Sequence, residues 1–238
     1  MQLKRYQKDF DYSYSFGIYP TMELLKNKAE YVEKILLKEG AERFDGVKDI
    51  LDLCSRKNIP FEYRDKVIDK IAFKENTFVV GMFRKYESPI DGSRNHIVLL
   101  EPRNMGNVGT IVRSMLGFNF KDLCIIGPGV DIFAPKVISS TMGSLFSMNF
   151  SKFNSINEYS VTNSNRNLYI FTLEGSEDIS SVEFKEPFSF VFGNESKGIE
   201  NIDLSIGKSI YIPQSKELES LNLSVAASIA MWESFKKR

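Results

Sequence analysis

Small and polar residues collect in three short segments that follow apolar runs in the second half of the chain. Such residues at the carboxyl ends of strands commonly bind ligands in α/β proteins. In the first segment Asn107 and Arg113 lie six residues apart, so both could approach one site from the same end of a helix. The alternative interpretation of this spacing is an asparagine cap followed by a surface arginine.

The second segment is an apolar strand that runs directly into Gly193, Asn194 and Glu195. Glycine lets a ligand approach the backbone, and a carboxylate at a strand end is a common functional placement; an ordinary β-turn is the alternative. In the third segment Ser220 and Asn222 open a helix rich in small residues. Ser220 would cap this helix on a purely structural interpretation, and the small residues suit close packing within the chain or across a dimer.

Several other chemistries are disfavoured by what the sequence lacks. One strand is followed by Gly-Pro-Gly, but Ile132 stands where the dinucleotide-binding fingerprint needs its third glycine, and no Walker-type Gly-Lys-Ser/Thr is present. The single histidine, His96, precludes a multi-histidine metal site, and its position at the start of a strand indicates a structural role. Cys54 and Cys124 alone form neither a zinc site nor a disulfide framework.

The composition is that of a globular protein, with 42% hydrophobic and 26% charged residues among 238. A formal net charge of zero argues against nucleic-acid binding by bulk electrostatics, and the first 94 residues carry only 18 Lys and Arg against 16 Asp and Glu. No apolar run approaches the roughly 20 residues that span a bilayer, and the start is too polar for a signal peptide. These features predict a cytoplasmic protein.

The N-terminal third is predicted to be a small αβ module. Its expected elements are a helix over Met22–Leu36 with Thr21 as N-cap and Gly40 at its end, helices over 47–54 and 64–72, and a strand over 78–83. The polar, turn-rich stretch 85–95 marks the expected domain boundary.

From His96 onward the pattern changes to alternating strands and helices, which predicts an α/β fold with a parallel sheet. The strands are expected at 97–101, 122–127, 168–173, 188–193 and 208–213. The helices are expected at 107–117, 135–142 and 221–236.

Taken together and in this order, the three polar segments resemble the three motifs of the TrmH/SpoU family of SPOUT-class RNA ribose methyltransferases. Each motif alone is weak, whereas three at the right order and spacing over about 140 residues are specific. The matching positions are Asn107, Gly109 and Arg113; Gly193, Asn194, Glu195 and Gly198; and Ile212, Pro213, Ser220, Leu221, Asn222 and Ser224.

The resemblance implies a fold that composition could not indicate. Residues 96–238 would form a SPOUT methyltransferase domain with a parallel sheet and a deep trefoil knot, and the family is dimeric through this domain. Residues 1–90 resemble, more loosely, the αβ RNA-binding substrate domain that many members carry. No metal is implied.

The resemblance also implies a cofactor and a reaction, the transfer of a methyl group from S-adenosyl-L-methionine to a ribose 2′-hydroxyl. The implied cofactor-binding residues are Thr172, Leu173, Gly175, Gly193, Asn194, Ile212, Gln214 and Leu221. The implied catalytic residues are Asn107, Arg113, Glu195, Ser220 and Asn222. The sequence departs from the family at Gln214 and Lys216, which usually are Met and Gly and shape the cofactor loop.

By this analogy Arg113 contacts the 2′-hydroxyl and acts as the base, while Asn107 positions the substrate. Because an arginine side chain has a pKa above 12, a second version has Arg113 orient the hydroxyl and bind a neighbouring phosphate. Ribosomal RNA is the expected substrate and transfer RNA the runner-up. A non-catalytic RNA-binding or ribosome-assembly protein on the same fold is the main alternative, and a Rossmann-type oxidoreductase is the third.

Overall fold

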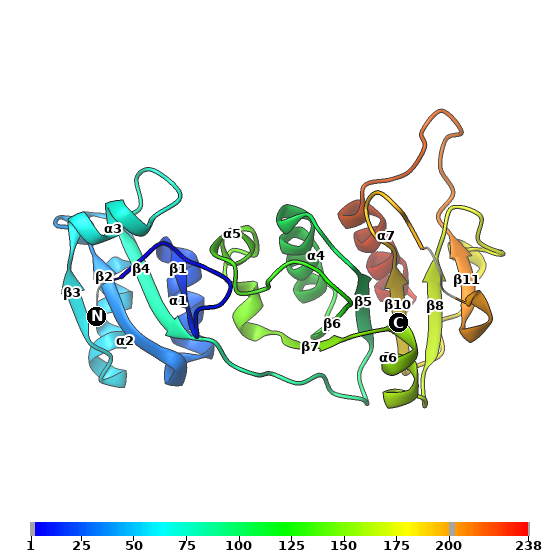
Figure 1. Ribbon diagram of the computed structural model, residues 1–238, viewed down its shortest axis with the longest axis horizontal. Coiled ribbons are helices and arrows are strands. Elements are labelled where there is room, and N and C mark those ends of the chain that lie inside the picture. The colour runs from blue at the N-terminus through cyan, green and yellow to red at the C-terminus, as the bar shows by residue number, and fades with distance from the viewer. Residues whose placement is uncertain (1–2, 200–202, 238) are drawn as a thin grey trace. The chain divides into compact units, whose positions relative to one another are not determined.

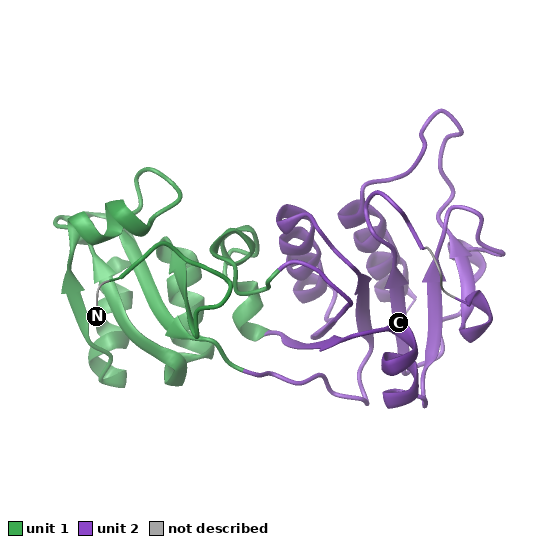
Figure 2. Cartoon of the chain, in the orientation of Figure 1, with its two compact units in different colours: residues 1–86, 131–147 green, residues 87–130, 148–238 purple. Residues whose placement is uncertain are grey.

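The computed structural model describes residues 3–199 and 203–237. They form two compact units, which Figure 2 shows in different colours. The first unit comprises residues up to 86 together with 131–147, and the second comprises 87–130 and the residues from 148 onward. No helix in the described ranges is long and apolar enough to cross a membrane.

Segment 131–147 packs with the first unit, although the sequence analysis placed it in the C-terminal domain. Within that unit, the Ser13 hydroxyl donates a 2.5 Å hydrogen bond to the carbonyl oxygen of Phe133. Gly143 lies so close to Glu23 that a Cβ atom would overlap its side chain. These contacts join residues about 120 positions apart, so no local pattern in the sequence could reveal them.

The first unit is built on a four-stranded sheet in the order β1-β4-β2-β3 (Figure 1). Leu25 and Ile35 belong to the core between this sheet and its first two helices, whereas Leu36 and Ile68 belong to the core on the other face. The elements of the unit are β1 (Tyr12–Phe16), α1 (Ile18–Asn27), β2 (Val32–Leu37), α2 (Val47–Lys57), β3 (Phe61–Tyr63), α3 (Asp65–Ile71), β4 (Val79–Arg84) and α5 (Pro135–Ser140).

The helix predicted over Met22–Leu36 is wrong in its second half. The helix ends at Asn27, residues Val32–Leu37 form strand β2, and Gly40 follows that strand with a left-handed φ of 73°. The apolar spacing suits a helix, but β2 pairs with β4 on one side and with β3 on the other. These long-range backbone hydrogen bonds override the local periodicity.

Thr21 is not the N-cap of α1, since the residue in that position is Gly17. Thr21 is buried inside the helix, where its hydroxyl lies 2.9 Å from the hydroxyl of Ser15 on β1. The helices predicted over 47–54 and 64–72 and the strand over 78–83 are confirmed as α2, α3 and β4. Strands β1 and β3 were not predicted.

The second unit is an α/β fold on a sheet whose described strands are all parallel, in the order β7-β6-β5-β10-β8-β11-β9. The predicted parallel sheet is therefore confirmed. Its elements are β5 (His96–Leu100), α4 (Met105–Gly117), β6 (Asp122–Ile126), β7 (Asn149–Phe153), α6 (Ile156–Thr162), β8 (Asn167–Phe171), β9 (Glu177–Asp178), β10 (Phe188–Phe192), β11 (Lys208–Tyr211) and α7 (Leu223–Lys236).

The five strands and three helices predicted from His96 onward are present, with ends shifted by at most two residues. Strands β7 and β9 and helix α6 were not predicted. β7 is only partly buried along most of its length, and its sequence, Asn149–Phe153, mixes polar and aromatic residues, so it lacks the apolar run that marked the other strands.

The central strands of this sheet are buried on both faces, as expected for a parallel sheet covered by helices. Val98 and Val191 point into a core that Tyr159 of α6 completes. Helices α4 and α7 contact each other, and α7 contacts β10 (Figure 1).

The order of the strands creates a switch point between β5 and β10. From β5 the chain moves outward to β6 and β7 on one side, whereas β8 and β11 lie on the other side of β10. Loops that leave the carboxyl ends of such neighbouring strands diverge, and the crevice between them is the usual ligand site of open α/β sheets.

The opposite, amino-terminal edge of the sheet is closed by a buried chain of hydrogen bonds. His96 Nδ1 lies 2.8 Å from the Tyr159 hydroxyl, and Nε2 lies 2.9 Å from the carbonyl oxygen of Asp91. The carbonyl can only accept, so Nε2 carries the proton and Nδ1 accepts from Tyr159. The chain continues to Ser189 and then to the guanidinium of Arg166. His96 is therefore a structural residue.

Replacing His96 by Gln should flatten the acid dependence of stability. Burial lowers the pKa of His96 to about 4. Between pH 6.5 and 4, His96 is therefore protonated in the unfolded chain but not in the folded chain. Stability from this residue is thus complete above pH 6.5 and falls as the pH drops, by at most about 1.4 kcal/mol per pH unit. Urea unfolding of both proteins at pH 7, 6 and 5 measures the free energy of unfolding. An equal fall of this free energy with pH in the two proteins would contradict the prediction.

Candidate active site

The carboxylate of Glu195 lies at the switch point and holds the loop that follows β5. Its Oε2 accepts a hydrogen bond from the backbone N–H of Arg103 at 3.1 Å, and its Oε1 accepts one from the N–H of Asn104 at 3.0 Å. The side-chain amide of Asn107 donates to Oε1 at 3.3 Å. One side chain from the loop after β10 therefore fixes the start of α4.

Asn107 connects this carboxylate to the third segment. Its carbonyl oxygen accepts a hydrogen bond from the amide of Asn222 at 3.1 Å, while its own amide donates to Glu195. Asn107 is buried and uses both ends of its side chain within the protein. We call Glu195, Asn107 and Asn222 the three-motif clamp, because each residue comes from a different polar segment.

Helix capping explains how the clamp residues are oriented. The side chain of Asn104 accepts hydrogen bonds from the N–H groups of Gly106 and Asn107, so Asn104 is the N-cap of α4. Asn222 caps α7 by accepting from the N–H of Ser224. Asn107 and Ser220 are thus not the caps of these helices, contrary to the structural interpretations of the two segments. Ser220 is exposed in the loop before α7.

Asn194 shapes the loop that presents Glu195. Two backbone hydrogen bonds of 2.9 Å between Asn194 and Gly198 close the loop at its base. The side-chain oxygen Oδ1 of Asn194 accepts hydrogen bonds from the N–H groups of Ser196 and Lys197. The side-chain amide of Asn194 donates to the backbone carbonyl of Glu101 at 2.7 Å. A Cβ on Gly193 would overlap the backbone of Gly198, so the loop requires glycine there.

The hydrogen bonds keep Glu195 ionised. Partial burial alone would raise its pKa, but the N–H groups of Asn104, Arg103 and Asn107 outweigh this effect and leave the pKa below its ordinary value. A carboxylate of low pKa accepts protons poorly. Glu195 is therefore suited to holding donors in place rather than to acting as a base.

Arg113 does not join the clamp. Six residues along α4 rotate its side chain by about 120° from Asn107 around the helix axis. The side chain is exposed, and its guanidinium forms no hydrogen bond or ion pair with the rest of the described chain. Arg113 therefore lies outside the hydrogen-bonded clamp, and its place at a common site with Asn107 stays a prediction.

The expected cofactor-binding residues lie on three loops at the carboxyl ends of β8, β10 and β11. Thr172 follows β8 and bonds to β11 through its N–H and the Ile210 carbonyl at 3.0 Å. A Cβ on Gly175 would overlap the backbone of Ile210, so this loop and β11 are in close contact. Leu173 is exposed, whereas Ile212 and Leu221 are partly buried.

Gln214 lies in the loop between β11 and α7. Its amide is 3.5 Å from the carbonyl oxygens of both Leu218 and Glu219, so it bridges the two arms of that loop weakly. Lys216 is exposed at its tip. A methionine at position 214 has no amide and could not form this bridge.

The sequence profile of the SpoU rRNA Methylase family matches residues 94–232. This match covers more than half of the chain and includes all three motifs. The chain belongs to the SpoU rRNA methylase family.

Two curated proteins show the same relationship over part of their length. A 23S rRNA (uridine(2479)-2′-O)-methyltransferase of Streptomyces viridochromogenes is 28% identical over 145 residues, which are 58% of this chain and 50% of the relative. An uncharacterised tRNA/rRNA methyltransferase of Synechocystis is 24% identical over 156 residues, 64% of this chain and 57% of the relative. The chain thus spans about half the length of the relatives it matches.

Solved structures share the fold over nearly the whole chain. An AdoMet-bound rRNA methyltransferase from Sinorhizobium meliloti superposes with a TM-score of 0.80 at 21% identity, covering 95% of this chain and 87% of that one. The SpoU methyltransferase AviRb from Streptomyces viridochromogenes, in complex with AdoMet, gives 0.80 at 18% identity, with 95% and 90% covered.

Within this SpoU-family site, sequence reasoning missed the groups that meet Glu195. They are backbone N–H groups of residues 103 and 104, whose side-chain types carry no information about the contact. The N-cap role of Asn104 did have a signal, because asparagine immediately before a helix favours that position. The structure also places the exposed side chain of Arg103 beside the clamp.

Asn107→Asp should destabilise the second unit at neutral pH. The change places a second carboxylate where an amide now donates to Glu195 at 3.3 Å, and two carboxylates this close cannot both ionise without cost. We expect a melting temperature lower by roughly 5 °C at pH 7, with a smaller loss at pH 4.5, where one of the pair is protonated. Thermal unfolding by circular dichroism measures the difference.

The matched control is Asn165→Asp, at an exposed loop position of the same unit. It should leave the melting temperature unchanged at both pH values. If Asn107→Asp behaves like this control, the hydrogen bond to Glu195 does not contribute to stability.

Proposed function

We propose that the protein is a methyltransferase that transfers the methyl group of S-adenosyl-L-methionine to a ribose 2′-hydroxyl in ribosomal RNA. The observation that carries the proposal is the three-motif clamp, in which Glu195 binds the start of α4 and Asn107 binds Asn222. Three segments separated by up to 115 positions meet at the switch point of the sheet. An rRNA substrate would place the enzyme in the cytoplasm.

The residues at the ends of β8, β10 and β11 fit the proposed cofactor. The close backbone contacts at Gly175 and Gly193 bring three loops together, with Ile212 and Leu221 as partly buried apolar side chains. Backbone amides and apolar side chains suit an adenine ring and an amino-acid group. When bound, S-adenosylmethionine would supply an electrophilic methyl group, and a ribose oxygen would attack it in line with the sulfur.

The clamp acts as a positioning device in this proposal, while Arg113 contacts the substrate. Glu195 is a poor base, because its pKa is lowered and both of its oxygens already accept hydrogen bonds, and the amide of Asn107 has no basic group. Arg113 orients the 2′-hydroxyl or a neighbouring phosphate. Arg113 lies about 120° from Asn107 around α4 and forms no hydrogen bond or ion pair with any described residue, so we assign it to the site of a second copy.

An exposed aromatic surface at the carboxyl-terminal ends of α4 and α7 supports association with a second copy. Trp232 is half exposed at 50%, and its ring lies 6.0 Å from that of Phe118 and 6.4 Å from that of Phe235. Contiguous exposed aromatic side chains mark association surfaces. The small residues of α7 serve packing within the unit instead, since Ala227 and Ala230 are fully buried.

Two further parts of the proposal concern the whole chain. The first unit, an αβ module on its own sheet, would bind the RNA substrate. The carboxyl-terminal unit would carry the deep trefoil knot of its family.

The first test is transfer of labelled methyl from S-adenosylmethionine to unmodified ribosomal RNA and, separately, to transfer RNA. Transfer RNA is included because a solved structure described as concerning 2-OH methylation of C/U34 on tRNA resembles 62% of this chain, with a TM-score of 0.57. Label in ribosomal RNA supports the proposal. Label in transfer RNA alone changes the substrate class.

Arg113→Ala should abolish transfer with little loss of cofactor affinity, because Arg113 lies outside the three cofactor loops and its side chain forms no hydrogen bond or ion pair with the described residues. Calorimetric titration of S-adenosylmethionine measures the affinity. Absence of both transfer and cofactor binding in the unaltered protein would favour a non-catalytic RNA-binding protein on the same fold.

Mixing Arg113→Ala with Asn107→Ala protein should restore transfer that neither variant shows alone. In a mixed dimer, one site would combine the intact Asn107 of one copy with the intact Arg113 of the other. Size-exclusion chromatography with light scattering checks that the mixture is dimeric. A mixture that stays inactive would place Arg113 and Asn107 in the same chain's site or outside the mechanism.

A further inference from the structure

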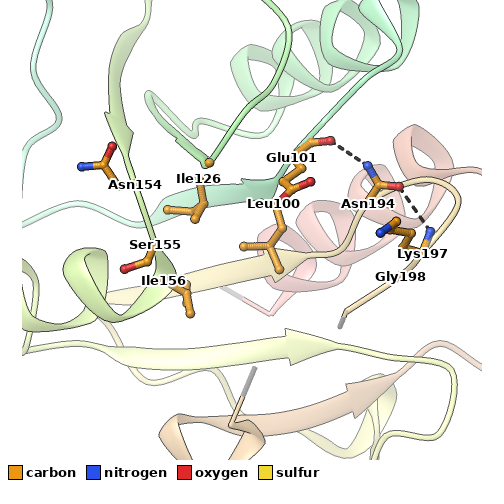
Figure 3. A pocket seen from close by; sticks show the side chains of 10 residues that line it. Leu100, Glu101, Ile126, Asn154, Ser155, Ile156, Asn194, Lys197 and Gly198 are labelled. Carbon is orange, nitrogen blue, oxygen red and sulfur yellow. Dashed lines mark hydrogen bonds between the residues drawn. The ribbon is translucent and has the colours of Figure 1, made fainter. Parts of the chain in front are cut away.

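A pocket opens at the carboxyl ends of β5, β6 and β7, beside the loop that carries Asn194 and Glu195 (Figure 3). It has a volume of about 280 Å³, slightly below the range of roughly 300–1,000 Å³ that holds drug-sized ligands. Leu100 and Ile126 lie at its centre in the view, with Glu101 and Asn194 on one side and Asn154, Ser155 and Ile156 on the other. The size suits one nucleobase with part of its sugar.

Glu101 is held in this pocket by an unusual backbone conformation. Its φ is 44°, in the left-handed region that glutamate rarely adopts. The backbone carbonyl of Glu101 accepts the Asn194 amide at 2.7 Å, and its N–H donates to the Ile126 carbonyl at 2.9 Å. Such strain is kept where surrounding bonds enforce it, and it is concentrated at functional sites.

The glycine after β6 makes room for the Glu101 side chain. A Cβ on Gly127 would lie 3.3 Å from Glu101 Cγ and 3.6 Å from its Oε1, so the carboxylate rests against this glycine. Gly127 has a φ of 70° and lines the pocket as well. Backbone conformation and neighbouring residue together direct the carboxylate along the pocket wall.

The amide and hydroxyl side chains around the pocket are bonded within the fold, and the exposed Lys197 also lines it. Both ends of the Asn194 side chain are bonded to backbone, the Asn154 amide donates to Glu158 at 2.9 Å, and the Ser155 hydroxyl accepts the Glu158 N–H at 3.1 Å. By contrast, the Glu101 carboxylate receives no hydrogen bond or ion pair from any described residue. It is the lining's one carboxylate, and it is free to accept.

We propose that this pocket receives the base of the nucleotide to be methylated, and that Glu101 selects guanine; the inference rests on the proposed function. A carboxylate only accepts hydrogen bonds. Guanine presents two adjacent donors, N1–H and the 2-amino group, to its two oxygens. Uracil offers one N–H between two carbonyls, and adenine and cytosine offer an amino group beside an acceptor nitrogen. Unpaired bases are commonly read on this edge.

The position of the pocket agrees with a role in substrate binding. Asn194 lines it, and the next residue, Glu195, belongs to the clamp. The loop 193–198 therefore has the pocket on its β5 side, while the expected cofactor loops follow β8 and β11 on the other side of β10. A base held by Glu101 would bring its ribose toward the clamp, between pocket and cofactor loops.

The test compares binding of guanosine and uridine 5′-monophosphates to the full chain by ligand-observed saturation-transfer NMR. We expect the guanosine nucleotide to bind at least about tenfold more tightly, and Glu101→Gln to remove that preference, since a good bidentate contact contributes a discrimination of this size. Glu183→Gln, an exposed carboxylate change in the same unit, should keep the preference.

A second variant keeps the test decisive if Glu101→Gln fails to fold. Ile156→Phe enlarges a side chain at the pocket wall and should weaken guanosine nucleotide binding while the melting temperature stays within a few degrees. Equal affinities for the two nucleotides, no saturable binding, or an unchanged preference in Glu101→Gln would overturn the proposal.

Two further measurements separate this inference from the proposed function. Glu101→Gln should leave S-adenosylmethionine affinity unchanged and lower methyl transfer to RNA at least about tenfold, and the nucleotide methylated by the unaltered protein should be a guanosine. Transfer to another nucleotide overturns the guanine pocket alone. Failure of the unaltered protein to bind S-adenosylmethionine refutes the methyltransferase, while nucleotide binding still reports on the pocket.

Discussion

The convergence of donors on the Glu195 carboxylate is the interaction on which the site depends. Two backbone N–H groups and the Asn107 amide donate hydrogen bonds to its oxygens. The side-chain oxygen of Asn107 in turn accepts a hydrogen bond from Asn222. A buried or half-buried carboxylate is costly unless it is so paired, and hydrogen bonds to an ionised group are among the stronger ones. Without Glu195 the N–H groups of Arg103 and Asn104 would lose their acceptor, and Asn107, which binds Asn222, would lose one of its two partners.

The two edges of the parallel sheet are used in opposite ways. At the amino-terminal edge, His96, Tyr159 and Ser189 satisfy one another in a buried chain that leaves little capacity for a ligand. At the carboxyl edge, the loops diverge at the switch point between β5 and β10, and polar groups there face a pocket. The clamp belongs to the open carboxyl edge, where ligands of such sheets usually bind.

Elements with a continuous apolar run were predictable, because burial on both faces of a parallel sheet demands such runs. Strands β5, β6, β8 and β10 were found for this reason. The apolar spacing of Met22–Leu36 predicted one helix, but its second half forms strand β2. This strand is stabilised by pairing with β4 and β3. Likewise, residues 131–147 pack with a unit whose nearest partners lie about 120 positions away, which no local pattern encodes.

By itself the sequence determined the parallel α/β fold, the three motifs and the family they indicate, since apolar runs and residue spacing are local properties. Tertiary structure alone decided which residues meet. In the folded chain Asn107 bonds to Glu195 and Asn222, and Arg113 lies outside this hydrogen-bonded set. Glu101 lines a pocket in a left-handed conformation. These outcomes depend on helix phase and on backbone groups brought together by strand order, and neither can be read from residue types.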